Sequence, residues 1–122
     1  MTKKSSFVLN RIKSIGYAFK GACYLIKNEK SIQVQFGLGI IMTIAGFYYD
    51  ISATEWMIQI LLIGVIMTIE GVNSVIEEIA DFIHPEFHKK IGLIKDISAG
   101  AVFIFAIAAS IIGLIIYIPK IF

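Results

Sequence analysis

Residues 56–83 read WMIQILLIGVIMTIEGVNSVIEEIADFI, and the organisation of the whole chain can be worked out from this segment. Residues from Trp56 to Ile69 are mainly apolar, and beyond Glu70 apolar residues recur at helical spacing, at positions 72, 76, 79, 80 and 83. A helix of about 30 residues would be about 45 Å long, whereas the hydrocarbon core of a bilayer is about 30 Å thick. The segment therefore predicts one helix over 54–83 that crosses a membrane, emerges into the cytoplasm and ends at Pro85.

The composition of the chain also indicates a membrane protein. Of its 122 residues 57% are hydrophobic, and the mean hydropathy is +0.82. A soluble domain of this length could not bury so much apolar surface, because small domains bury a smaller share of their chain. We expect a single membrane domain over 1–122. No basic face on a soluble scaffold indicates a nucleic-acid partner, and the lone Cys23 excludes an intrachain disulfide and a cysteine-based metal site.

Two further apolar runs, 32–49 and 96–118, are predicted to span the membrane, with residues 84–95 forming a polar cytoplasmic loop. Ten of the eleven basic residues lie before the first run or within that loop. The turn from Asp50 to Glu55 has no basic residue and is flanked by Tyr49 and Trp56. Because positive charge marks cytoplasmic segments, the N-terminus is predicted inside and the C-terminus outside.

Residues 7–30 are predicted to form an amphipathic helix, since apolar residues recur at helical spacing among basic ones. Such a pattern is typical of a helix that lies in the membrane surface with its apolar side down. A helix packed on a protein partner is the alternative, and both can hold together. The prediction is thus an all-α membrane protein with one surface helix and three transmembrane helices.

Five polar residues after Ile69 fall on one face of the predicted second span, whereas Glu78 falls away from it. At 3.6 residues per turn this face carries Glu70, Asn73, Ser74, Glu77 and Asp81, which we call the acidic stripe. Charged side chains at the end of a span cost free energy, so they are candidates for function. No lysine follows any of the carboxylates at i+4, as it often would on a solvated helix face.

Carboxylates in this arrangement suit phosphoryl transfer. Such groups can hold Mg²⁺, and another carboxylate in the stripe can accept a proton from an attacking hydroxyl. Glu29, Lys95 and Asp96 are expected at similar depth, where a lysine can neutralise a phosphate. A proton or ion relay and a structural polar cluster are the alternatives. The sequence has no P-loop and no Gly-x-Gly-x-x-Gly, and Pro85 disfavours a zinc site at His84 and His88.

At this point the sequence resembles a known family. The pattern Glu70-x-x-Asn73-Ser74-x-x-Glu77-x-x-x-Asp81, then Glu86-Phe87-His88 and Lys95-Asp96-x-x-Ala99-Gly100, resembles the signature of the bacterial diacylglycerol kinase family, which includes undecaprenol kinases. Gly16-Tyr17-x-x-Lys20-Gly21 and Asn28-Glu29 fit as well. The resemblance implies a homotrimer in the inner membrane of a bacterium, with active sites between subunits. It also implies transfer of phosphate from ATP, with Mg²⁺, to a membrane lipid alcohol.

The resemblance also implies roles for individual residues. Glu70 would be the general base, Glu29 and Glu77 would bind the metal that bridges the ATP phosphates, and Asn73 and Asp81 would support the stripe. The residues implied around the nucleotide are Tyr17 near its base, Lys95 on its phosphates, and Glu86, His88 and Asp96. The residues implied near the lipid are Arg11, Ser31, Gln33, Gln35 and Ala99.

Diacylglycerol is the expected acceptor and undecaprenol the alternative within the same class. A non-catalytic trimeric transporter or channel with a ring of carboxylates is the alternative from a different class, and a purely structural bundle is a third. Phosphorylation that depends on ATP and Mg²⁺ would distinguish the kinase from both.

Overall fold

The computed structural model describes residues 3–86 and 88–122, and these form four α-helices. The helices are α1 (Lys3–Asn28), α2 (Lys30–Tyr48), α3 (Ala53–Ile83) and α4 (Lys89–Ile121). By length and hydropathy α2, α3 and α4 can each cross a membrane. The predicted class, an all-α membrane protein with three spans, is confirmed. Phe87 of the motif quoted above lies outside the described residues.

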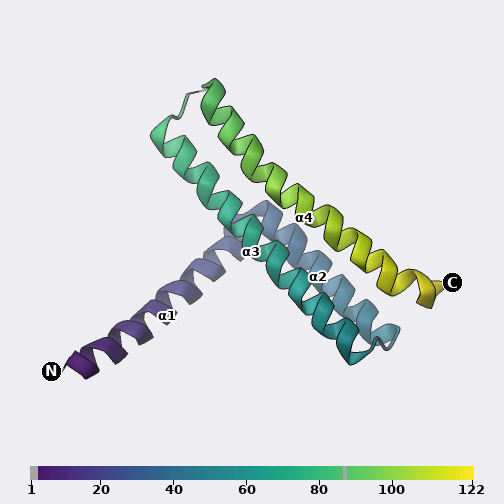
Figure 1. The fold of residues 1–122 in the computed structure, drawn as a ribbon. Helices are drawn as coiled ribbons and strands as arrows, with labels where there is room; N and C mark the ends of the chain where they lie inside the picture. Colours follow the sequence, from purple (N-terminus) through teal and green to yellow (C-terminus); the bar gives the residue numbers. More distant parts are fainter. Residues whose placement is uncertain (1–2, 87) are drawn as a thin grey trace.

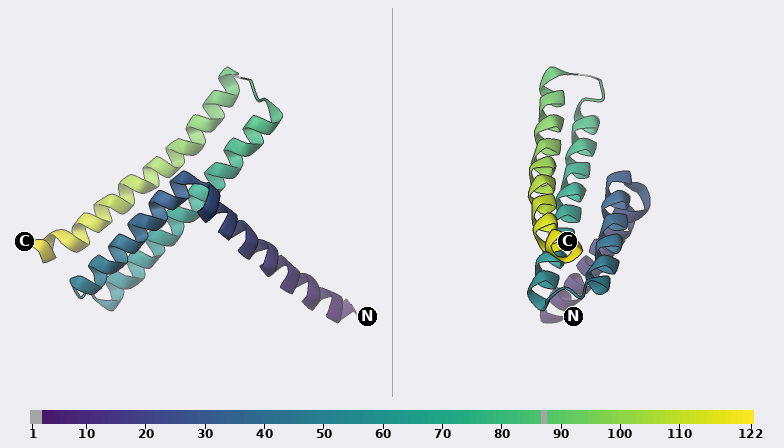
Figure 2. Two further views of the ribbon diagram at one scale, coloured as in Figure 1. Left: turned by 180° about the vertical axis from the view of Figure 1, so that it is seen from behind. Right: turned by 90° about the vertical axis from the view of Figure 1, so that its right-hand side faces the viewer.

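The three apolar helices run side by side, while α1 leaves them at a steep angle (Figures 1 and 2). The corner between α1 and α2 lies partway along α3 rather than at its end. The last turns of α3 and the first turns of α4 therefore continue beyond α2 as a pair, which we call the α3–α4 extension. This arrangement places the acidic stripe at the level of the corner and beyond it.

The turn between α2 and α3 is built from local hydrogen bonds. The Ser52 hydroxyl accepts a hydrogen bond from the Glu55 amide at 3.1 Å, and the Glu55 carboxylate accepts one from the Ser52 amide at 2.9 Å. This capping box satisfies amides that the first turn of α3 leaves free. Asp50 has a φ of 50°, a left-handed conformation that an aspartate tolerates better than most residues.

Close to this turn, a buried hydrogen-bonded cluster joins the three apolar helices. Tyr117 of α4 donates a hydrogen bond to the Gln59 side-chain carbonyl of α3, and Gln59 donates from Nε2 to the Met42 carbonyl of α2 at 2.9 Å. Gln59 and Tyr117 are 5% and 7% exposed. At the surface beside them, Lys120 pairs with Glu55 at 2.9 Å. Each polar group in the cluster thus has a partner, as burial requires.

Elsewhere the helices present large apolar side chains outward, among them Phe47, Leu61 and Ile104, which are 76%, 66% and 71% exposed. A soluble protein rarely exposes continuous apolar surface of this extent. Lipid, or a neighbouring subunit, would cover it.

The sequence predicts a polar loop over 84–95, but α4 already begins at Lys89, so the described loop residues lie between 84 and 88. The His88 side chain caps α4 by accepting a hydrogen bond from the Lys90 amide at 3.1 Å. Lysines are good helix formers, so the charged residues that suggested a loop are compatible with a helix. At the other end α4 passes through Pro119 to Ile121.

Candidate active site

Glu29 occupies the corner between α1 and α2. It is the single residue between the two helices, with φ −99° and ψ 115°, and it is the N-cap residue of α2. Its amide still donates to the Leu25 carbonyl at 3.0 Å, and its carbonyl accepts from the Gln33 amide at 3.0 Å. One extended residue therefore turns the chain without losing the hydrogen bonds on either side.

The corner contacts the acidic stripe of α3. The Ser74 hydroxyl lies 3.4 Å from Glu29 Oε2 and 3.1 Å from the Glu70 carbonyl oxygen, one turn earlier on α3. Ser74 is only 6% exposed. A buried serine thus connects the carboxylate at the corner with the backbone of Glu70, and Glu29 is placed beside the stripe.

Asn73 carries the one unsatisfied buried side-chain oxygen in the described part of the chain. Its Oδ1 atom is buried and has no hydrogen-bond partner there. Leaving such an acceptor unpaired costs about 1–3 kcal/mol. The oxygen is therefore available to a donor or a cation from outside this chain.

The oxygens around the stripe fit a hard cation. Glu70 and Glu29 are partly exposed and Glu77 is exposed, while Asn73 adds the unpaired amide oxygen. Among the described residues no three His, Cys, Asp or Glu side chains are gathered in one group. Mg²⁺ does not require such a group, because it is commonly bound by one or two carboxylates with substrate phosphates and water.

The sequence placed Asp81 in the stripe and Lys95 on a phosphate, but it did not predict that the two are paired. In the structure Lys95 Nζ makes an ion pair with the Asp81 carboxylate across the α3–α4 extension. The two side chains are 35% and 56% exposed. A pair this accessible adds little stability, about 1 kcal/mol or less, so a phosphate could replace the aspartate as the lysine's partner.

Most of the residues predicted around the nucleotide lie in or near the loop between α3 and α4. His88 caps α4, Glu86 offers its carbonyl to His84 Nδ1 at 2.7 Å, and Asp96 is exposed next to Lys95. Tyr17 does not lie there. It is 72% exposed on α1, about three turns before the corner, on the helix that points away from the bundle.

The residues predicted near the lipid are not brought together within one chain. Arg11 stacks over the Phe7 ring at 5.2 Å on α1, and Ser31 and Ala99 are exposed on different helices. Gln33 donates from Nε2 to the Lys27 carbonyl at 3.0 Å, so it caps the end of α1. Sequence spacing could not separate this capping role from a role in lipid binding.

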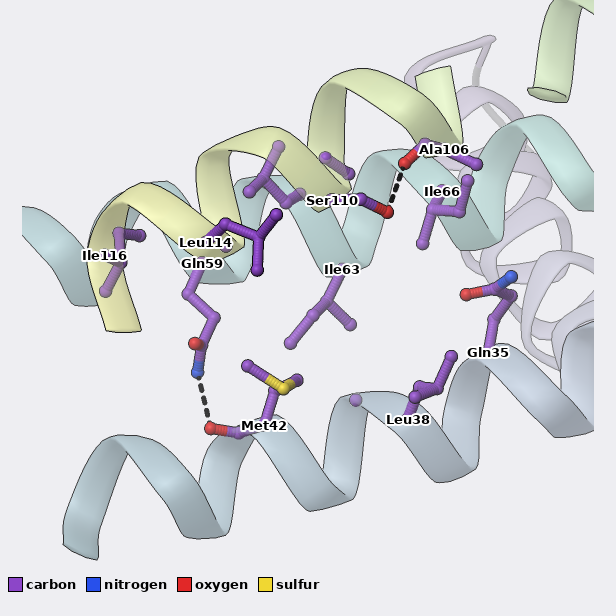
Figure 3. Close-up of a pocket in the computed structure, with 14 residues that line it drawn as sticks. Gln35, Leu38, Met42, Gln59, Ile63, Ile66, Ala106, Ser110, Leu114 and Ile116 are labelled. Atoms are coloured by element: carbon purple, nitrogen blue, oxygen red, sulfur yellow. Dashed lines mark hydrogen bonds between the residues drawn. The ribbon is translucent and has the colours of Figure 1, made fainter. Parts of the chain in front are cut away.

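Gln35 instead lines a pocket of about 370 Å³ between α2, α3 and α4 (Figure 3). Gln35 and Gln59 lie toward its two ends, and most of its other lining residues are apolar. Ile66, which also lines it, lies one turn before Glu70 on α3. An apolar pocket at membrane depth thus ends close to the acidic stripe.

The fold and this site define the chain as a small multi-pass membrane protein with a row of carboxylates where one span leaves the apolar segment. Residues 16–117 match the family described as prokaryotic diacylglycerol kinase. The chain is 38% identical over 113 residues to the undecaprenol kinase of Bacillus subtilis, covering 92% of each protein. It is 32% identical over 101 residues to the diacylglycerol kinase of Escherichia coli, covering 82% of each.

The chain therefore belongs to the prokaryotic diacylglycerol kinase family. It is a lipid kinase, as the resemblance indicated, and this excludes the non-catalytic transporter and the purely structural bundle as its function. The matched relatives include kinases named for two different acceptors, so family membership alone leaves the acceptor open.

Proposed function

We propose that this lipid kinase transfers the γ-phosphate of ATP to the hydroxyl of a membrane lipid alcohol in a reaction that requires Mg²⁺. The observation that carries the proposal is the contact of Glu29, at the α1–α2 corner, with the Glu70–Ser74 turn of α3. This contact supports a single site made from carboxylates that are 41 positions apart in the sequence, since 70 − 29 = 41.

Glu70 is the proposed general base. Its carboxylate lies on the stripe at the end of the apolar part of α3, where a lipid hydroxyl could reach it from the membrane. By accepting the hydroxyl proton, Glu70 makes the lipid oxygen a better nucleophile toward the γ-phosphorus. The new oxygen–phosphorus bond forms as the bond from phosphorus to the bridging ADP oxygen breaks.

Glu29 and Glu77 are the proposed metal-binding residues, with the Asn73 amide oxygen available as a further partner. When bound, Mg²⁺ would neutralise negative charge on the phosphates. The contribution of the chain is to hold these oxygens at one level of the bundle. Ser74 supports this arrangement because its single hydroxyl hydrogen is shared between the Glu70 carbonyl and the Glu29 carboxylate.

Lys95 is proposed to bind the phosphates, with Asp96, Glu86 and His88 around the rest of the nucleotide and Tyr17 near its base. Lys95 is paired with Asp81 in the structure, and a phosphate could replace the aspartate as its partner. The position of Tyr17 on a helix that points away from the α3–α4 loop supports an arrangement in which neighbouring chains complete each site. We therefore propose a homotrimer with active sites between subunits.

We propose that the corner and the α3–α4 extension face the cytoplasm, and that the Asp50 turn and the C-terminus face outward. The distribution of basic residues supports this orientation.

Undecaprenol is proposed as the first acceptor to test, ahead of the diacylglycerol expected from the sequence. The greater identity and coverage of the match to the undecaprenol kinase support this order. The pocket beside Gln35 and Ile66 is proposed to hold the hydrocarbon part of the acceptor, with its hydroxyl toward Glu70.

The experiment offers undecaprenol and diacylglycerol together in detergent micelles with MgATP that carries a labelled γ-phosphate. We expect label mainly on undecaprenol, no transfer without Mg²⁺, and transfer that is slower by about 10²–10⁴-fold in the Glu70→Gln variant. Label on diacylglycerol alone would overturn the proposed acceptor and keep the kinase mechanism. Wild-type transfer rates after complete removal of divalent metal would overturn the role of Mg²⁺.

A further inference from the structure

The contact between α1 and α3 consists of two residue pairs in matching register. Leu25 lies one turn before Glu29, whose amide donates to the Leu25 carbonyl, and Gly71 and Ser74 are three positions apart on one face of α3. Leu25 packs on Gly71, and Glu29 meets Ser74. The apolar contact and the polar contact therefore form one docking surface.

Gly71 is buried, and it leaves no room for a side chain. A Cβ atom there would lie 3.1 Å from Cδ1 of Leu25 and 4.0 Å from Cδ2. Gly64, two turns earlier on the same helix, would meet nothing within 4 Å. A glycine inside a helix costs about 1 kcal/mol relative to alanine, and at position 71 the close approach of Leu25 explains why it is present.

We propose that Gly71 is a positioning residue for Glu29. Because Gly71 has no side chain, Leu25 packs directly against α3. This contact, which we call the Leu25 seat, holds the corner in the position at which the Glu29 carboxylate reaches Ser74. Gly71 touches neither substrate nor metal, and it acts through the position of α1. The inference rests on the proposed function, in which Glu29 binds the metal.

The first test exchanges the sizes of the two residues. Gly71→Leu pushes Leu25 away and is expected to raise the Mg²⁺ concentration for half-maximal turnover by about tenfold, as loss of a residue that orients a metal ligand commonly does. The double variant Gly71→Leu with Leu25→Ala is expected to return close to wild type, because the new side chain fills the space that Leu25 leaves.

Ile26→Ala combined with Gly71→Leu is the matched control. Ile26 is adjacent in sequence, is 37% exposed and does not contact Gly71. We expect this combination to keep the high Mg²⁺ requirement of Gly71→Leu. Rescue by Ile26→Ala as well as by Leu25→Ala would show that any loosening of α1 restores activity. That result would overturn the proposal that the Leu25 seat on Gly71 positions the corner.

The second test measures the position of α1 without relying on turnover. Spin labels are placed on cysteines introduced at Lys13 and Glu78, in a Cys23→Ser background, with labelled chains diluted into unlabelled ones. The distance distribution is expected to shift in Gly71→Leu and to return in the double variant with Leu25→Ala. An unchanged distribution in Gly71→Leu would overturn the proposal.

The two readouts separate the possible failures. A shifted distance with a wild-type Mg²⁺ requirement would overturn the role of Gly71 in positioning Glu29. If the wild-type protein has no MgATP-dependent kinase activity, but the variants show the expected distance changes, the proposed function is overturned and the Leu25 seat is supported. Both changes together, reversed by Leu25→Ala, would support the proposal in full.

Discussion

At the residue scale, two uncharged side chains, Ser74 and Asn73, lie among the candidate catalytic groups. Ser74 contacts Glu29 and the Glu70 backbone, and Asn73 holds a buried oxygen without a partner. Neutral polar residues in a membrane helix can orient carboxylates without adding further charge that must be desolvated. Ser74 thus contacts the Glu29 carboxylate through a neutral hydroxyl, whereas Asp81 of the stripe is paired with Lys95.

Glu70→Gln tests the role of the base. An amide cannot accept the hydroxyl proton, so turnover is expected to fall by about 10²–10⁴-fold. Nucleotide binding should remain, because Glu70 is not assigned to the metal or to ATP. Turnover is measured with MgATP and the preferred lipid, and nucleotide binding by calorimetry. Loss of both would contradict the assignment.

Asn73→Leu separates a functional role of Asn73 from a structural one. Replacing this half-buried amide, whose oxygen is buried and unpaired, by an apolar side chain of similar size is expected to raise stability by about 1 kcal/mol. Turnover is expected to fall at least about tenfold, because an oxygen near the metal is lost. Thermal unfolding in detergent and a kinase assay provide the two measurements. A destabilised but fully active variant would show that Asn73 is structural.

At the element scale, the two ends of the α3–α4 pair are held differently. Near the Asp50 turn, Tyr117 and Gln59 form a buried cluster that links α4, α3 and α2. Beyond the corner, α2 no longer accompanies the pair, and the partly exposed Asp81–Lys95 ion pair links α3 to α4. Stability is therefore expected to be concentrated at the first end and freedom of movement at the second.

Tyr117→Phe tests the stabilising end. Removing the hydroxyl leaves the Gln59 carbonyl buried without a donor, at a cost of about 1–3 kcal/mol. The melting temperature in detergent should fall, while KM for ATP stays constant because the cluster is remote from the stripe. Tyr48→Phe is the matched control, since Tyr48 is 80% exposed. Equal melting temperatures for both variants would contradict this role.

Lys95→Met tests the end of the α3–α4 pair that lies beyond the corner. Loss of the ammonium group is expected to raise KM for ATP by about tenfold, if one charge-assisted bond to phosphate is lost. Stability should change by less than about 1 kcal/mol, because the pair with Asp81 is accessible to water. Lys89→Met serves as the control in the same helix. A KM as in wild type would show that Lys95 serves only to pair with Asp81.

At the scale of the whole molecule, a single chain carries the parts of the site but does not gather all of them. Glu29, Ser74 and Glu70 meet at the corner, whereas Tyr17 is displaced along α1. Wide apolar surfaces on α2, α3 and α4 remain uncovered. Association of chains within the membrane would cover part of this surface and bring α1 of one chain toward the loop of another.

Subunit mixing tests this arrangement. Chains that carry Glu70→Gln or Lys95→Met are expected to be impaired when each is assembled alone. If the Glu70 and Lys95 of one site come from different chains, co-assembly of the two variants creates some sites in which both residues are intact. We expect the mixture to exceed the sum of the separate activities after joint refolding. Mixing without refolding is the control. No gain from verified mixed trimers would show that both residues act within one chain.

The sequence by itself determined the three apolar helices long enough to span a membrane, the N-terminal helix before them, and the alignment of the acidic stripe on one face of α3. Hydropathy and helical period are local properties, and the bilayer makes them strong signals because each span must satisfy its own backbone. The tertiary structure decided which residues meet. The pairs Leu25–Gly71, Glu29–Ser74 and Asp81–Lys95 depend on where helices cross, and the early start of α4 depends on the His88 cap. The point at which two helices cross is set by packing between segments that are distant in the sequence. The helical period of a single segment carries no information about that point.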